Sequence, residues 1–126
     1  MLIGSPDEKE GAGSIIAECR EKIYDLVGKT TMSLLPAVLK TCRLFVGLDS
    51  AGQHIAAAVG TPTLGIYGPS SPASWAPRGE RHYVIQKKWS CVPCRRKGCQ
   101  DTEKSRCLDD LNVDEVFAAV RRALSL

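Results

Sequence analysis

The chain has 126 residues, of which 44% are hydrophobic and 25% are charged, and its formal net charge is +3. This composition is ordinary for a globular domain and excludes a disordered chain, and no window approaches the ~20 apolar residues of a membrane-spanning helix. The small net charge does not by itself indicate nucleic-acid binding. The chain opens without a basic leader or a long apolar segment, so we expect a cytoplasmic protein.

Apolar runs and helical patterns alternate through the first two thirds of the chain. Ser14 is expected to cap a helix that buries Cys19, and Ser33 is expected to cap another that carries Pro36 in its first turn. The runs that suit strands are Leu2–Gly4, Tyr24–Val27, Leu44–Val46, Thr63–Tyr67 and His82–Ile85. Strands separated by helices predict an α/β fold, a Rossmann-like parallel sheet with helices on both faces.

A short polar turn follows the third of these strands. Asp49 and Ser50 end the strand, the run His54–Val59 is typical of a compact helix, and Gly60 is placed as its left-handed stop. The first N–H groups of a helix have no partner within it and carry partial positive charge, so this turn can bind an anion. Ser50 can add a hydroxyl and His54 an imidazole. The alternative is an ordinary capped helix with His54 in solvent.

The same stretch carries a longer pattern. The string Asp49–His54, then an alanine-rich helix, then Gly60–Pro62 and Gly68-Pro69, resembles the signature of glycosyltransferase family nine, the bacterial heptosyltransferases. That signature is Asp-Ser/Thr-Gly-x-x-His, an Ala-rich helix, Gly-Thr-Pro, a strand and Gly-Pro-Thr/Ser. Ala51 stands where the family has Gly, and a glycine follows one place later, which alters the backbone of the turn. The resemblance covers nearly the whole chain and implies the C-terminal half of a GT-B glycosyltransferase.

The resemblance implies a set of donor-binding residues. Lys29, in a Gly-Lys-Thr turn, would offset diphosphate charge, and Thr30 would line the base pocket through its backbone. Glu8 follows a strand end, where open sheets bind ligands, and would lie near the ribose; the alternative for Glu8 and Lys29 is a solvated side chain. The diphosphate would rest on the amides that follow Asp49, at Ser50, Ala51 and Gly52. His54 would reach the phosphate or the sugar.

The resemblance also implies substrates and partners. The donor would be a nucleotide-sugar, with ADP-heptose the family's best-known example, and the acceptor would be of the lipid A-core type at the inner membrane face. This half would supply no catalytic residue and no organic cofactor, and the acceptor-binding N-terminal half would be missing or a separate chain. We therefore expect donor binding without turnover by this chain alone, at the membrane periphery, with no nucleic-acid partner.

The last third contains a Cys-rich loop at 90–107, in which basic residues are also frequent. Two thiolates two residues apart can hold one metal ion, and two more complete the tetrahedron of a structural zinc site. Reduced thiols, internal disulfides and an iron–sulfur cluster are the alternatives. The four cysteines concerned are Cys91, Cys94, Cys99 and Cys107, out of six in the chain.

A C-terminal helix is expected at 112–125, because Asn112 and Glu115 form a capping signature. Its apolar stripe consists of Val113, Val116, Phe117, Val120 and Leu124. We therefore predict one nucleotide-sugar-binding domain over residues 1–126. A second hypothesis is a basic binding module, stabilised by a bound metal, that binds nucleic acid or an acidic partner. A third is a redox protein that uses Cys91 and Cys94.

Overall fold

The computed structural model describes residues 1–125, without the side chain of Asp101, and divides the chain into two compact units. The first unit is Met1–Val38, and the second begins at Leu39. The helix α2 (Leu35–Lys40) spans the boundary between them in sequence.

The first helix of the first unit starts earlier than predicted. A 3-10 turn η1 (Pro6–Glu8) leads directly into α1 (Lys9–Glu18), so Ser14 lies inside the helix and does not cap it. The start is fixed by Glu8, whose carboxylate accepts from the N–H of Ser5 at 2.6 Å and from its hydroxyl at 2.8 Å. This is a capping box, and its Ser-x-x-Glu spacing is readable in the sequence. Cys19, predicted to be buried, is exposed just beyond the helix.

The two strands predicted in the first unit are reduced to a short parallel pairing. Leu2 pairs with Asp25, and the N–H of Leu26 donates to the carbonyl of Leu2 at 2.9 Å. The N–H of Gly28 then donates to the carbonyl of Gly4, also at 2.9 Å. The predicted direction of pairing is therefore confirmed, while the predicted extent of the strands is wrong.

The turn before α2 is capped by a different residue from the predicted Ser33. The hydroxyl and the carbonyl of Thr31 both accept from the N–H of Leu34, at 3.2 and 3.0 Å. Pro36 lies in the first turn of α2, as predicted, where its missing N–H costs nothing.

The second unit is built on a parallel sheet in which the strand order equals the chain order. Its strands are β1 (Phe45–Leu48), β2 (Thr63–Tyr67) and β3 (His82–Gln86). The register pairs Phe45 with Thr63, and Thr63 with His82. β2 is the central strand and its residues are almost completely buried. The three strands predicted here, and their parallel pairing, are confirmed.

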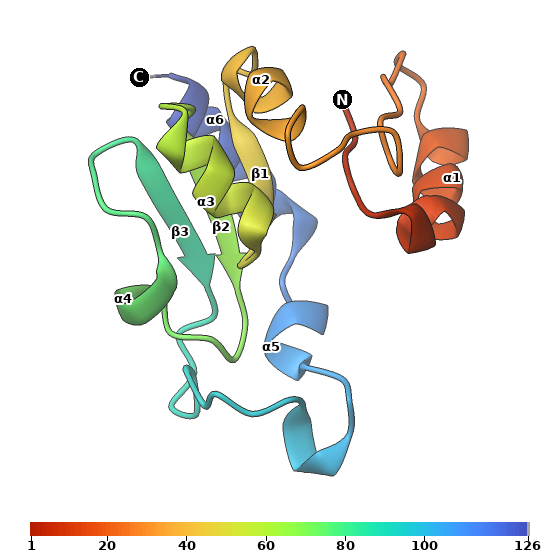
Figure 1. Ribbon diagram of the computed structural model, residues 1–126. Helices are drawn as coiled ribbons and strands as arrows, with labels where there is room; N and C mark the ends of the chain where they lie inside the picture. The colour runs from red at the N-terminus through yellow and green to blue at the C-terminus, as the bar shows by residue number, and fades with distance from the viewer. Residues whose placement is uncertain (126) are drawn as a thin grey trace. The chain divides into compact units, whose positions relative to one another are not determined.

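Helices cover this sheet from both sides. Figure 1 shows α3 (Ala51–Ala58) in front of the sheet and α6 (Val113–Leu124) behind it. α3 packs on β1 and β2, and α6 packs on β2 and β3. α3 ends at Ala58, and Gly60 follows two residues later with a φ of +84°, the left-handed conformation predicted for a helix stop. The shorter elements are α4 (Pro72–Trp75), η2 (Cys99–Asp101) and α5 (Arg106–Asp109).

The C-terminal helix begins as predicted but buries other residues. The side chain of Asn112 accepts from the N–H of Asp114 at 2.8 Å, and Glu115 accepts from the N–H of Asn112 at 2.9 Å. Ala119 and Ala123 are the buried residues, whereas Val113 is 80% exposed and Phe117 is 60% exposed. The predicted apolar stripe is therefore correct in part: Val116 and Val120 are half-buried, whereas its other three members are exposed.

Candidate functional site

The predicted anion-binding turn lies where β1 ends and α3 begins, at the carboxyl edge of the sheet. Ser50 is the N-cap residue of α3, in an extended conformation, and its side chain makes no capping hydrogen bond. Its carbonyl accepts from the N–H of Gln53 at 3.1 Å. The N–H groups of Ala51 and Gly52 precede the first bonds within the helix, so they remain donors for an acceptor from outside it. Unpaired N–H groups at the start of a helix can bind an anion.

The start of α3 is held against β2 by a buried polar contact. The hydroxyl of Tyr67 donates to Oε1 of Gln53 at 3.0 Å, and both residues are fully buried. Burial raises the pKa of the Tyr67 hydroxyl, and the charge of Asp49 raises it further. Within residues 1–125, Nε2 of Gln53 is a buried polar atom without a hydrogen-bond partner. The contact fixes the first turn of α3 relative to the carboxyl end of the central strand.

Two glycines allow this close approach. A Cβ on Gly65 would collide with the amide of Gln53 and would lie 2.6 Å from the ring of Tyr67. A Cβ on Gly52 would lie 3.2 Å from the ring of Phe45, so α3 passes close over β1 as well. Small residues at these positions therefore bring the helix N-terminus down onto the sheet edge.

Asp49 and His54 flank the turn. Nε2 of His54 lies 3.9 Å from Oδ1 of Asp49, and the His54 side chain is 47% exposed. When the imidazole is protonated, the pair neutralises itself in the absence of a ligand. An incoming phosphate would compete with Asp49 for the imidazolium. Asp49, Ser50, Ala51, Gly52 and His54 are thus gathered at one turn of the second unit.

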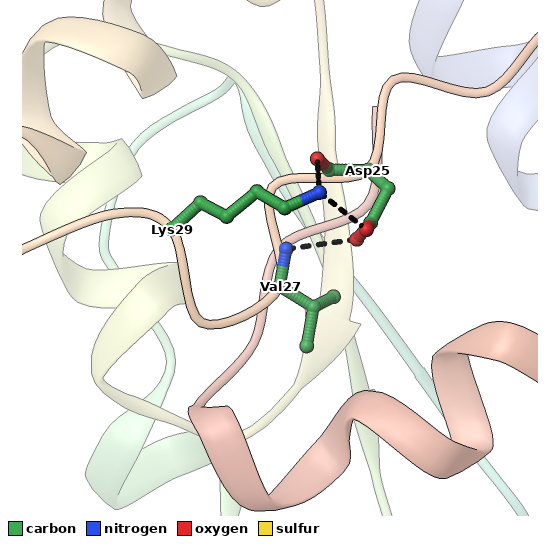
Figure 2. Close-up of polar contacts among 3 residues, drawn as sticks. All are labelled: Asp25, Val27 and Lys29. Carbon is green, nitrogen blue, oxygen red and sulfur yellow. Dashed lines mark hydrogen bonds and ion pairs between the residues drawn. The ribbon is translucent and has the colours of Figure 1, made fainter.

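The other three predicted donor residues, Lys29, Glu8 and Thr30, belong to the first unit. Two of them have hydrogen-bond partners, and the third is half-buried. Figure 2 shows Lys29 bound to Asp25: its ammonium lies 2.7 Å from Oδ2 and 3.0 Å from the backbone carbonyl. The N–H of Val27 donates to Oδ1 of the same carboxylate at 3.0 Å. These bonds hold the pKa of Asp25 below its usual value, the Lys29 bond contributing most. Glu8 is engaged by Ser5, and Thr30 is half-buried.

The predicted metal ligands are not arranged as a metal site. Within the part of the chain that the structure describes, no group of three or more His, Cys, Asp or Glu side chains gathers closely enough to hold an ion. All four thiols are free, with Cys91 exposed and Cys107 buried. Burial raises the pKa of the Cys107 thiol, and the charge of Cys99 adds to the shift.

The Cys-rich loop is nevertheless anchored at the carboxyl edge of the sheet. The N–H of Arg95 donates to the carbonyl of Pro69 at 2.7 Å. The side chain of Leu108 lies over Gly68, where a Cβ would come within 2.6 Å of it. The amide of Gln86 donates to the carbonyls of Gly68 and Ser70, at 2.8 and 2.9 Å, and fixes the turn that receives the loop.

The sequence reasoning missed the contact between Gln53 and Tyr67. The two residues are 14 positions apart, and no short pattern links them. A glycine inside a buried strand does mark a close approach of another element, so Gly65 was the available signal.

Comparisons with known proteins agree with the pattern seen at this turn. A family model described as glycosyltransferase family 9 (heptosyltransferase) matches residues 1–104. The chain therefore belongs to glycosyltransferase family 9.

Curated relatives and solved structures extend the match over nearly the whole chain. Lipopolysaccharide heptosyltransferase 1 of Pseudomonas aeruginosa is 30% identical over 120 residues, which is 94% of this chain and 33% of the relative. Lipopolysaccharide heptosyltransferase 3 of Escherichia coli K12 is 39% identical over 124 residues, 95% of this chain and 35% of the relative. The structure of E. coli ADP-heptose lps heptosyltransferase II superposes with a TM-score of 0.77 at 25% identity, covering 98% of this chain and 35% of that one.

These matches confirm the predicted Rossmann-like α/β fold and the family. The chain spans about a third of the length of the curated relatives that it matches. None of the helices within residues 1–125 combines the length and the apolar character needed to cross a membrane.

Proposed function

We propose that this chain forms the donor-binding part of a heptosyltransferase-like glycosyltransferase, and that the diphosphate of a nucleotide-sugar binds at the start of α3. The observation that carries the proposal is the uncapped N-terminus of α3 at the carboxyl edge of a parallel sheet. Open α/β sheets bind their ligands at this edge. The family membership of the chain agrees with that location.

In this proposal the N–H groups of Ala51 and Gly52 donate to the diphosphate, and the hydroxyl of Ser50 and the imidazole of His54 add further donors. During sugar transfer the departing diphosphate gains negative charge, and fixed donors already aimed at it stabilise that charge without reorganisation. Protonated His54 would leave Asp49, 3.9 Å away, for the phosphate. The buried bond between Tyr67 and Gln53 keeps the donors in place.

We also propose donor contacts for three residues of the first unit, on the strength of the family pattern alone. Lys29 would offset the charge of the diphosphate while its ammonium keeps its ion pair with Asp25. Thr30 would line the base pocket through its backbone. Glu8 would accept from the ribose diol through the oxygen that Ser5 leaves free, since both bonds from Ser5 go to Oε2.

The donor and acceptor follow from the relatives. A solved structure similar to this chain is described as an ADP-heptose lps heptosyltransferase, so ADP-heptose is the donor we propose. The relatives are about three times as long as this chain, so we propose that an acceptor-binding half binds a lipid A-core acceptor beside this one, at the cytoplasmic membrane face. The chain alone would bind donor without turnover.

The test is calorimetric titration of the chain with ADP, UDP and GDP. We expect ADP to bind and His54→Ala to weaken it about tenfold, the loss of one charge-assisted hydrogen bond. The matched control is His82→Gln, which alters the one other histidine, at the opposite edge of the sheet. Absence of ADP binding, or equal weakening by both variants, contradicts the proposal. Salt-sensitive binding of nucleic acid without ADP binding would instead favour the basic-module reading.

We also propose that Cys91, Cys94, Cys99 and Cys107 bind a thiophilic ion such as Zn²⁺. The support is their number and spacing, together with thiolate chemistry that suits zinc. The thiols as arranged do not form the site, so the loop would have to close around the ion. Metal analysis after reconstitution with zinc should find one ion per chain, lost in Cys94→Ser and kept in Cys19→Ser, which alters an exposed cysteine outside the loop. Equal zinc content in both variants would contradict the site.

A further inference from the structure

A polar cavity lies at the amino edge of the sheet, opposite the donor turn. It measures about 380 Å³ and lies entirely within the second unit. Its walls come from the segments that precede the three strands and from the last turn of α6: Lys40 and Arg43 before β1, Gly60 and Thr61 before β2, Arg81 before β3, and Leu124. Because the strands are parallel, all of their starts meet at this one edge.

Three cations line this cavity, and among residues 1–125 no carboxylate does. Lys40, Arg43 and Arg81 are all exposed, and among residues 1–125 none of them forms an ion pair. The terminal nitrogen of Arg81 would lie 3.9 Å from a Cβ on Gly60, so the guanidinium extends over that glycine. The charge of Arg81 also contributes to the lowered pKa of His82.

The helix ends at this edge do not balance the three charges. α2, α3 and α6 all end here, and a helix C-terminus carries about half a unit of negative charge. Three such ends offset about half of three full positive charges. Among residues 1–125 a positive surplus therefore remains around this cavity, and a bound anion would relieve the repulsion between the cations.

The remaining walls indicate what kind of anion fits. Two guanidinium groups match a phosphate in the bidentate manner, and an ammonium adds a point charge. Val59, Pro62, Ala123 and Leu124 form an apolar side to the same cavity. A volume of about 380 Å³ exceeds that of a bare phosphate and lies in the range of small-molecule sites.

We infer that the amino edge of the sheet is a second ligand site, for a phosphate monoester whose phosphate contacts Lys40, Arg43 and Arg81 and whose apolar part lies against Leu124. It is separate from the donor turn, which lies at the carboxyl edge. A free metabolite and a lipid headgroup both present this chemistry, and the experiment distinguishes them.

The experiment is amide NMR of the ¹⁵N-labelled chain, titrated with inorganic phosphate and with phenyl phosphate. We expect the amides of Gly60 and Thr61 to shift and to saturate, with phenyl phosphate binding more tightly than inorganic phosphate because of the apolar wall. Arg43→Gln and Arg81→Gln should each weaken binding about tenfold or more, and the double variant should abolish it. Arg78→Gln is the matched control, since Arg78 is an exposed arginine of the same unit outside the cavity.

A second arm separates the two sources of the ester. Broadening of the same amides by phosphatidylcholine vesicles that contain phosphatidic acid, and not by phosphatidylcholine alone, assigns the site to a lipid headgroup. Response to phenyl phosphate without response to these vesicles assigns it to a soluble ester. Shifts confined to Ala51 and Gly52, shifts that survive in the double variant, or no shift with any probe would overturn this inference. Of these three outcomes, only shifts confined to Ala51 and Gly52 would still support the proposed donor site.

Discussion

The buried contact between Tyr67 and Gln53 makes a quantitative prediction about stability. Tyr67→Phe removes the hydroxyl that donates to Oε1 of Gln53 and leaves the shape of the ring unchanged. Because Nε2 of Gln53 already has no partner within residues 1–125, the variant buries an amide with neither end satisfied. The amide cannot turn to solvent without leaving its place against Gly65.

The size of the effect follows from these contacts. A buried polar group that loses its partner costs about 1–3 kcal/mol, so we expect Tyr67→Phe to lower the free energy of unfolding by about 2 kcal/mol. Gln53→Met keeps the length of the side chain. It leaves the Tyr67 hydroxyl without a partner but removes the unpaired Nε2, so the free energy of unfolding should fall by less than about 1 kcal/mol. The double variant has no polar atom at the contact and should be more stable than Tyr67→Phe alone.

The assay is urea unfolding of the four proteins of this cycle, followed by far-ultraviolet circular dichroism at one pH and one ionic strength. The coupling energy between the two positions should be about 1–2 kcal/mol, with the double variant restoring stability that Tyr67→Phe removes. Equal m-values across the four proteins would show that the unfolded states are comparable.

Two results would refute the reasoning. If Tyr67→Phe changed the unfolding free energy by less than about 0.5 kcal/mol, the amide of Gln53 would have another partner, such as an ordered water. If the two substitutions were additive, the hydroxyl and the amide would not be an energetic pair.

The other predictions concern single positions. Gly65→Ala should destabilise the chain by about 1–3 kcal/mol in urea unfolding, since its Cβ meets a rigid buried amide, whereas Gly11→Ala in α1, where nothing lies within 4 Å, should be neutral or stabilising. Burial, aided by Arg81, lowers the pKa of His82 from its ordinary value of 6.5, so the unfolded chain binds the proton more readily. The contribution of neutral His82 to the free energy of unfolding should therefore be fully present above pH 6.5 and be lost as the pH falls through the lower folded pKa. His82→Gln should lack this pH-dependent contribution. Parallel pH profiles of unfolding free energy for the two proteins would contradict the prediction. Asn112→Ala should cost about 1 kcal/mol of thermal or urea stability, and no change would show that α6 does not depend on its cap.

Local patterns predicted the second unit well. The strands at Thr63–Tyr67 and His82–Gln86 are short apolar runs between turn residues, and the stop at Gly60 uses a conformation that glycine adopts without strain. The cap of α6 by Asn112 also depends on neighbours within three positions. Each of these features is decided by residues close in sequence, so the sequence reveals them.

The error at α6 arose because the outcome depends on distant residues. The apolar pattern of α6 predicted an amphipathic helix. Which of its residues are buried depends on how closely the helix packs on β2 and β3, and the buried residues are Ala119 and Ala123. The helix start at Ser14 was wrong for a different reason. The capping box of Ser5 and Glu8 joins residues three positions apart, and it starts the helical segment well before Ser14.

The sequence by itself determined the family, the alternation of strands and helices, and the turn after Asp49 as an anion-binding candidate, because these rest on contiguous residues. Tertiary structure alone decided the bond between Gln53 and Tyr67 that fixes this turn, and the gathering of Lys40, Arg43 and Arg81 around one cavity. The physical reason is that parallel strands bring their ends together at a common edge. Residues some twenty positions apart thereby share one site, and no local pattern records that proximity.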